Sequence, residues 1–249
     1  MLHFAVIGSP IAHSRSPEIY GELFSKHGID AEFTRLLIEP CELSHIRSLS
    51  DGLSGFAVTM PHKRAIIPYL DRLASTAEEC GAVNIVERRG DELIGHNTDG
   101  DGLSDAITES GTQIGGASVL ILGRGGAARS AAFALRRRGA QIRFLVRSLS
   151  GTGDFPELPF SPKDHSSLPH ADVFINATPL GMQGAGEFED FGFLDAIAPG
   201  FVFDMVYRRD RETNLLREAG ERGIKALGGN AMLEKQALRA FEIWFGFKP

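Results

Sequence analysis

Cysteine is scarce in this sequence and positive charge is not in excess, and both absences narrow the possible functions. Cys41 and Cys80 are the two cysteines among 249 residues, and they do not form a C-x-x-C pair. A disulfide framework therefore has no basis, and we expect a reduced, cytoplasmic protein. The 26 Lys+Arg residues against 32 Asp+Glu residues give a formal net charge of −6. This mild acidity argues against nucleic-acid and membrane-surface binding, so we expect neither partner.

Long apolar runs and several catalytic motifs are also missing. No stretch approaches the length of a membrane span, and the N-terminus lacks the pattern of a signal peptide. The motifs H-E-x-x-H and G-x-S-x-G are absent, so zinc-peptidase and esterase chemistry has no anchor. Residues 97–102 (NTDGDG) look like the start of a calcium loop, but Thr108 stands where the acid of its twelfth position is needed. We therefore expect no metal site.

Alternating strand-like and helix-like segments predict an α/β fold in two parts. Before residue 100, the pattern includes a helix with Ser16 as its N-cap and a β-hairpin that turns near Gly90. After it, a helix over 102–110 leads into a strand–turn–helix–strand unit. We expect a loop over 150–164 and an amphipathic helix over 231–245.

A nucleotide-binding fingerprint follows the strand over 118–122. Residues 123–128 (GRGGAA) fit G-x-G-x-x-[GA], and a helical pattern begins directly after them. Glycines let the backbone turn tightly and approach a pyrophosphate, which then lies at the helix N-terminus. An ordinary tight turn is the alternative, but the strand–turn–helix context favours a dinucleotide.

The end of the next strand indicates which dinucleotide is bound. An NAD enzyme places Asp or Glu here, whereas residues 144–148 read FLVRS and contain no carboxylate. Arg147 can pair with a 2′-phosphate, so the segment favours NADP over NAD. A solvated arginine at a strand end is the alternative interpretation.

Lys63 has an informative position. It lies just past the strand over 56–60, on the bend where Pro61 ends that strand. In open α/β sheets, ligands bind at the carboxyl ends of the strands. Lys63 is therefore either a catalytic group or a surface lysine paired with an acid.

Seven fragments occur in a specific order along nearly the whole chain: SPIAHSRSP, VTMPHK, GAVN, NTDG, NATPLGM, DMVY and AMLEKQALRAFEIW. Together with the fingerprint, they resemble the shikimate dehydrogenase family, which includes the quinate/shikimate dehydrogenases. The resemblance implies an N-terminal substrate-binding domain over 1–100 and a Rossmann-type NADP-binding domain over 101–229. It also implies a C-terminal helix over 230–249 that packs back on the first domain.

The resemblance also implies roles for single residues. The catalytic pair would be Lys63 and Asp99. The residues that bind the substrate would be Ser14, Ser16, Thr59, Asn84, Asp99, Tyr207 and Gln236. The residues that bind the cofactor would be Gly123, Gly125, Gly126, Ala127, Arg147, Ser148, Asn176, Ala177, Thr178, Met205 and Gly229. Taken alone, Ser14 and Ser16 could equally be helix caps.

The activity implied is an NADPH-dependent, reversible reduction of 3-dehydroshikimate to shikimate, a step of chorismate and aromatic amino-acid synthesis. Two alternatives stay open: a quinate/shikimate dehydrogenase that uses NAD, and a non-catalytic NADP-sensing regulator, which would lack Lys63 or Asp99. We expect a monomer or a homodimer.

The sequence departs from the family pattern at three places. Arg124 replaces the usual alanine of the fingerprint, and Gly151 stands where the second arginine of N-R-T-x-x-R is usual. Residues 228–232 read GGNAM, where D-G-L-G-M is more usual.

Overall fold

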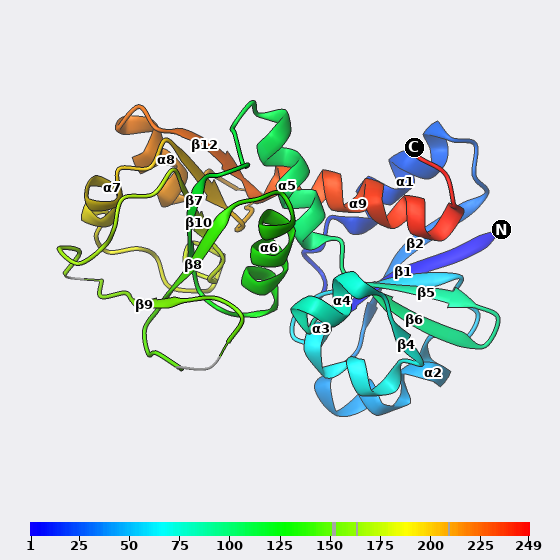
Figure 1. Cartoon of the computed structure of the whole chain (residues 1–249). Helices are drawn as coiled ribbons and strands as arrows, with labels where there is room; N and C mark the ends of the chain where they lie inside the picture. Colours follow the sequence, from blue (N-terminus) through cyan, green and yellow to red (C-terminus); the bar gives the residue numbers. More distant parts are fainter. Residues whose placement is uncertain (151–152, 163, 209) are drawn as a thin grey trace. The chain divides into compact units, whose positions relative to one another are not determined.

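The computed structural model describes residues 1–150, 153–162, 164–208 and 210–249. The chain forms two α/β units, one of Met1–Gly102 with Glu234–Pro249 and the other of Leu103–Leu233 (Figure 1). The α/β fold class expected from the sequence is confirmed.

The first unit is built on a mixed six-stranded sheet in the order β2-β1-β3-β5-β6-β4. The strands are β1 Leu2–Gly8, β2 Ala31–Leu37, β3 Gly55–Val58, β4 Arg72–Leu73, β5 Ile85–Arg89 and β6 Glu92–His96. The helices here are α1 Ser16–Lys26, α2 Ile46–Leu49, α3 His62–Ala65 and α4 Ser75–Cys80, with short 3₁₀ turns at η1 Pro40–His45 and η2 Ile67–Tyr69. Two longer helices, α5 Asp99–Glu109 and α9 Gly229–Phe245, run from one unit into the other.

Strand direction in this sheet brings four chain segments to one edge. β1 is parallel to β3, whereas β5 is antiparallel to both β3 and β6. The ends of β1, β3 and β6 therefore lie at the same edge as the start of β5. β2 and β3 pair with β1 on opposite sides, so this edge is also a topological switch point, where α/β sheets bind ligands.

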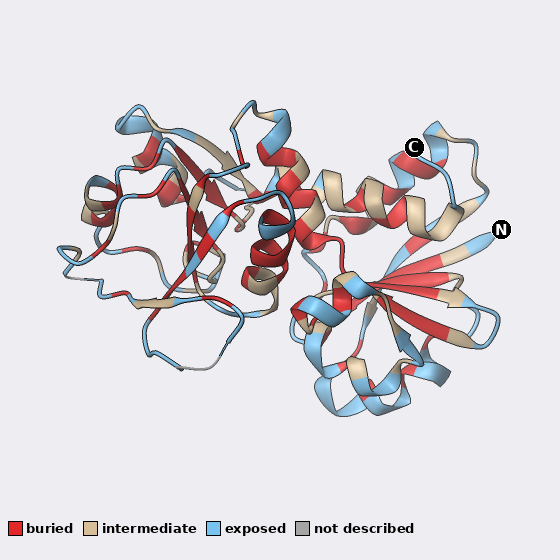
Figure 2. Cartoon of the chain, in the orientation of Figure 1, coloured by how far each residue is buried: buried red, intermediate tan, exposed pale blue. Residues whose placement is uncertain are grey.

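The C-terminal helix packs against the first unit, as expected. Ala237, Ala240 and Phe241 of α9 are buried in one cluster with Phe4 of β1 and Phe24 of α1. The indole nitrogen of Trp244 donates a hydrogen bond of 3.1 Å to the carbonyl oxygen of Val86 in β5. Burial of large aromatic side chains is a main source of core stability, and Figure 2 shows buried residues along α9 and the strands. α9 is thereby fixed on the sheet that carries the site.

The second unit contains a fully parallel sheet in the order β12-β11-β10-β7-β8-β9. Its strands are β7 Ser118–Leu122, β8 Gln141–Val146, β9 Glu157–Pro159, β10 Val173–Asn176, β11 Phe201–Asp204 and β12 Lys225–Gly228. Its remaining helices are α6 Gly126–Arg137, α7 Gly192–Ile197 and α8 Asn214–Glu221. Counted from β7, this is the 3-2-1-4-5-6 order of doubly wound dinucleotide-binding sheets, with the switch point between β7 and β10.

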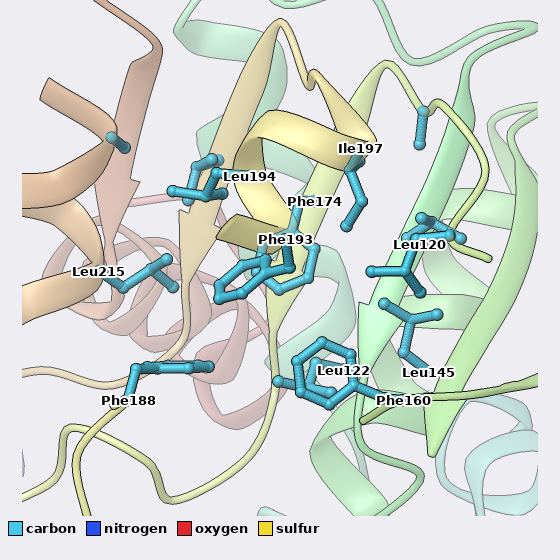
Figure 3. Close-up of a cluster of buried hydrophobic side chains, with 14 residues drawn as sticks. Leu120, Leu122, Leu145, Phe160, Phe174, Phe188, Phe193, Leu194, Ile197 and Leu215 are labelled. Atoms are coloured by element: carbon cyan, nitrogen blue, oxygen red, sulfur yellow. The ribbon is translucent and has the colours of Figure 1, made fainter. Parts of the chain in front are cut away.

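Aromatic packing fixes the strand ends of the second unit. Phe193 of α7 lies against Phe174 of β10, with ring centroids 5.1 Å apart (Figure 3). Both rings are fully buried, in one cluster with Leu145 of β8 and Leu215 of α8. The last residue of β10, Asn176, is therefore held by a packed strand.

Three predictions of local structure need correction, and one is confirmed. The N-cap of α1 is Arg15, with no side-chain cap, and Ser16 is the first helical residue. α5 begins at Asp99 instead of residue 102, since the Thr98 carbonyl already accepts from the Gly102 amide. The predicted loop over 150–164 contains β9, a short edge strand next to β8. Its prolines made the segment look like a loop in the sequence, but an edge strand tolerates proline. The hairpin is confirmed, because Arg89 pairs with Glu92 across Gly90 and Asp91.

Candidate active site

Lys63 and Asp99 form an ion pair at the switch-point edge of the first sheet. Lys63 lies in α3, directly after β3, and its carbonyl oxygen accepts from the Val83 amide at 2.7 Å. Its ammonium nitrogen donates to Oδ2 of Asp99 at 2.5 Å. The Asp99 side chain is 2% exposed and that of Lys63 is 24% exposed. The lysine is therefore held by a nearly buried carboxylate, yet it remains within reach of a ligand.

Asn84 organises the other side of this pair. Its amide nitrogen is 2.9 Å from Oδ1 of Asp99 and 2.8 Å from Oε1 of Gln236 in α9. Its side-chain oxygen accepts from the Thr98 amide at 2.8 Å. Both carboxylate oxygens of Asp99 are thus engaged, one by Lys63 and one by Asn84. Because Asp99 is also the first residue of α5, the helix dipole stabilises its negative charge.

Ser14 and Ser16 are buried together after β1. The Ser14 hydroxyl donates to the Ser16 hydroxyl at 3.2 Å and accepts from the Ser16 amide at 3.3 Å. Arg35 fixes this segment by donating to the Ser14 carbonyl oxygen from Nη2 at 2.5 Å and from Nε at 3.0 Å. Two adjacent hydroxyls at a helix N-terminus are suitable donors to a carboxylate.

Thr59 lies against the end of β1. A Cβ at Gly8 would be only 2.5 Å from Cγ2 of Thr59 and 2.9 Å from the Met60 carbonyl oxygen. Gly8 therefore permits the close approach of β1 to the segment after β3, and it sets Thr59 at the carboxyl end of β1. Thr59 is half-buried.

Tyr20 is a residue of this region that sequence reasoning missed. It follows Ser16 by four positions on α1, is 2% exposed, and stacks on Phe33 with ring centroids 4.4 Å apart. Burial raises the pKa of its phenol, and the negative charge of Asp99 raises that pKa further. The i, i+4 spacing from Ser16 is the signal that could have placed Tyr20 on the same helix face.

In the second unit, the glycine-rich turn leaves room for a pyrophosphate. Gly123 has φ +102°, a left-handed conformation that favours glycine, and a Cβ there would be 3.1 Å from Cγ2 of Thr178. A Cβ at Gly125, the N-cap of α6, would meet nothing within 4 Å. The first turn of α6 carries no acidic residue to compete for its amides. The turn therefore fits a bound dinucleotide, with Gly126 and Ala127 supplying the first helical amides.

Asp204 holds together the strand ends that border this turn. It is the last residue of β11 and is fully buried. One oxygen accepts from Asn176 Nδ2 at 2.9 Å and from the Val206 amide at 3.1 Å, and the other accepts from the Thr213 hydroxyl at 2.6 Å. Burial raises the pKa of Asp204 to about 6, although these hydrogen bonds oppose the shift. Sequence reasoning included this residue in DMVY but assigned it no role.

Most other predicted cofactor residues adjoin this network. The Asn176 side-chain oxygen accepts from the amide and hydroxyl of Thr178, at 3.0 and 2.7 Å. The Ala177 amide donates to the Leu122 carbonyl oxygen at 3.0 Å, which ties the end of β10 to β7. Gly229 approaches the Met205 carbonyl so closely that a Cβ would overlap it.

Three predicted residues lie apart from the two networks described above: Tyr207, Arg147 and Ser148. Tyr207 belongs to the second unit, whereas the other predicted substrate residues belong to the first. Arg147 and Ser148 follow β8 and are exposed, and Gly151, the position of the missing second arginine, lies outside the described residues.

Within the described part of the chain, no group of three or more His, Cys, Asp or Glu side chains could hold a metal ion. No helix there has the length and apolarity to cross a membrane.

One unit of this chain is a doubly wound sheet with an open glycine turn, and the other carries a Lys–Asp pair at a sheet edge. This combination indicates a dinucleotide-dependent oxidoreductase. A family model described as the shikimate dehydrogenase substrate binding domain matches residues 6–86. The curated shikimate dehydrogenase (NADP+) of Symbiobacterium thermophilum is 37% identical over 263 residues, which cover 97% of this chain and 88% of that protein. The chain belongs to the shikimate dehydrogenase family.

Solved structures agree with this assignment. The shikimate 5-dehydrogenase of Thermus thermophilus, in complex with NADP(H) and shikimate, matches with a TM-score of 0.86 at 30% identity and covers 100% of this chain and 95% of that chain. Shikimate dehydrogenase 1 of Peptoclostridium difficile matches with a TM-score of 0.87 at 28% identity, with 100% of this chain and 93% of that chain covered. The resemblance seen in the sequence is confirmed.

Proposed function

We propose that this chain reduces 3-dehydroshikimate to shikimate reversibly with NADPH, in chorismate and aromatic amino-acid synthesis. The observation that carries the proposal is the Lys63–Asp99 pair of 2.5 Å, which lies at the kind of sheet edge where α/β folds bind ligands. The similarity to curated NADP+-dependent shikimate dehydrogenases supports the reaction and its cofactor.

Lys63 supplies the proton in this mechanism. NADPH, when bound, supplies the hydride that the ketone carbon takes up. The ketone oxygen becomes negative as its double bond breaks, and the Lys63 ammonium stabilises this charge and donates a proton to it. The neutral amine then recovers a proton from solvent, and the reverse reaction uses that amine as the base. Asp99, held by Asn84, fixes the ammonium in place and accepts a hydrogen bond from a substrate hydroxyl.

The remaining substrate contacts are assigned to residues that match family positions. Ser14 and Ser16 donate to the carboxylate, while Thr59, Asn84 and Gln236 bind the ring hydroxyls. Tyr207 is proposed as a further substrate contact on the basis of the family resemblance.

The second unit binds the cofactor in this proposal. Gly123, Gly125, Gly126 and Ala127 bind the pyrophosphate, and Arg147 and Ser148 bind the 2′-phosphate. Asn176, Ala177 and Thr178 border the cofactor, and Met205 and Gly229 lie near the nicotinamide. A cytoplasmic location and a monomeric or homodimeric state remain predictions.

Ser14→Ala and Ser16→Ala should each raise the KM for shikimate more than they lower kcat. The carboxylate is remote from the reacting carbon, so its contacts contribute similarly to the ground state and the transition state. Steady-state kinetics with varied shikimate measure both constants. If KM is unchanged in both variants, the hydroxyl pair serves only the local structure of α1.

Arg147→Ala should weaken NADP+ binding by about tenfold or more and leave NAD+ binding nearly unchanged. A charge-assisted contact to a phosphate contributes roughly 1.5–3 kcal/mol, and 1.4 kcal/mol is a factor of ten. Isothermal titration of the purified chain with each dinucleotide measures the two constants. An equal loss for both would show that Arg147 does not bind the 2′-phosphate.

The decisive test of the proposed function is an assay of shikimate and quinate, each with NADP+ and with NAD+. We expect shikimate with NADP+ to give the highest kcat/KM. Highest activity with quinate and NAD+ would instead identify a quinate/shikimate dehydrogenase. A chain that binds NADP+ but turns over neither substrate would be a regulator.

A further inference from the structure

The fingerprint of this chain carries a large cation at a position the family usually gives to alanine. Arg124 follows Gly123 on the turn after β7, and its side chain is 46% exposed. Its Nη1 atom donates to the Ser148 carbonyl oxygen and to Oε1 of Glu157, each at 3.2 Å. Arg124 therefore reaches from the glycine-rich turn to the segment after β8 that contains Arg147.

Glu157 of β9 fixes the far end of the same segment. Its Oε2 accepts from the Ser150 amide at 2.6 Å, and its Oε1 accepts from the Ser150 hydroxyl at 2.8 Å. Hydrogen bonds thus hold residues 147–150 at two points, from Arg124 to Ser148 and from Ser150 to Glu157. This arrangement holds Arg124 of the glycine turn against the short segment that contains Arg147, with Glu157 as the adjacent counter-charge.

Register shows why this location matters for an adenosine phosphate. Leu122 and Leu145 pair near the ends of β7 and β8, so both strands end at one edge. The ribose of a dinucleotide is read at the end of the strand that follows the glycine turn. An arginine on the turn and an arginine on the segment after β8 can therefore approach one 2′-phosphate from two sides, and guanidinium forks suit phosphate oxygens.

We propose that Arg124 is the second cation of the 2′-phosphate subsite. It would serve in place of the second arginine of the family pattern, at whose position this chain has Gly151. The inference rests on the proposed use of NADP. It makes this chain select NADP through one arginine on the glycine turn and one after β8.

Nucleotide fragments test the proposal without turnover. The full chain is titrated calorimetrically with adenosine 2′,5′-bisphosphate and with 5′-AMP, which differ only by the 2′-phosphate. Arg124→Ala should weaken the bisphosphate by about tenfold or more and change 5′-AMP by less than about twofold. Arg143→Ala is the matched control, because it removes an exposed arginine from β8 itself, and should change neither constant.

A double mutant distinguishes direct binding of the phosphate by Arg124 from an indirect role in which Arg124 only positions Arg147. If Arg124 binds the phosphate, Arg124→Ala should still weaken the bisphosphate severalfold in an Arg147→Ala background. No further loss in that background would mean that Arg124 only positions Arg147, and it would overturn the proposal. So would an equal loss for both fragments, which indicates a distorted glycine turn.

The outcomes also separate this inference from the proposed function. Discrimination of the 2′-phosphate by Arg124, in a chain that does not oxidise shikimate, would support the inference and refute the function. If the chain oxidises shikimate but Arg124→Ala leaves the affinity for the bisphosphate unchanged, the proposed function is supported and the inference on Arg124 is refuted.

Discussion

Lys63→Met should lower kcat for shikimate oxidation by about 10²–10⁴-fold, the range expected when a positioned proton-transfer group is lost. Methionine keeps the length of the side chain but removes the charge near the developing oxyanion and the transferable proton. The KM for shikimate should change little, because the lost interaction strengthens mainly in the transition state. Affinity for NADP+ should persist, since Lys63 and the glycine turn belong to different units.

The fold of this variant should survive, although with lower stability. Asp99 would lose its cation, but Asn84 still donates to Oδ1 and the N-terminus of α5 still stabilises the charge. Circular dichroism and a thermal melt check this. Asp99→Asn should also reduce kcat, and the double mutant should lose much less than the product of the two single effects, because the residues act as one unit. A near wild-type kcat for Lys63→Met would reduce Lys63 to a strand-end lysine.

The position of Lys63 was predictable from sequence because it depends on local signals. An apolar run that ends at a proline marks the end of β3, and strand ends in α/β sheets carry ligands. The partner Asp99 came from the family resemblance. Its approach to Lys63 requires β6 to run parallel to β3 with β5 antiparallel between them, a pairing that local pattern does not specify.

The residues that hold the site were harder to predict for the same reason. Asn84 bonds to Gln236, which is 152 positions away in the chain, and it does so because α9 returns to the first sheet. In the sequence, Tyr20 appeared only as one aromatic residue of the predicted helix that begins near Ser16. Its relation to Asp99 depends on how α1 packs on the sheet, which is tertiary information.

In the second unit, the glycine turn and its neighbouring strands followed directly from the motif. The contact from Arg124 to Glu157 did not, because it needs β9, and Pro156 and Pro159 concealed that strand. Asp204 was likewise visible as a letter of DMVY, whereas its burial and its three donors are properties of the folded sheet.

Removing the Asp204 carboxylate should cost the second unit much of its stability. Asp204→Ala leaves the donors of Asn176, Val206 and Thr213 without their acceptor in a buried setting. At roughly 1–3 kcal/mol for each unsatisfied buried group, the free energy of unfolding should fall by at least about 3 kcal/mol. Asp204→Asn is milder, because its oxygen still accepts from Asn176 and Val206 while its amide donates to the Thr213 hydroxyl oxygen. Urea unfolding at pH 7.5 measures both changes.

The same pair of proteins should reveal the titration of Asp204. Its folded-state pKa of about 6 lies above the ordinary value of 3.8, so between these pH values the folded chain holds a proton that the unfolded chain releases. The free energy of unfolding of the wild type, relative to Asp204→Asn, should therefore fall as pH rises from about 4 to about 7, by on the order of 2–3 kcal/mol, and then level off. Other titrating carboxylates are common to both proteins and cancel in the difference. Urea midpoints at half-unit pH steps give this difference directly, and two curves that stay parallel across the range would show that Asp204 does not titrate there.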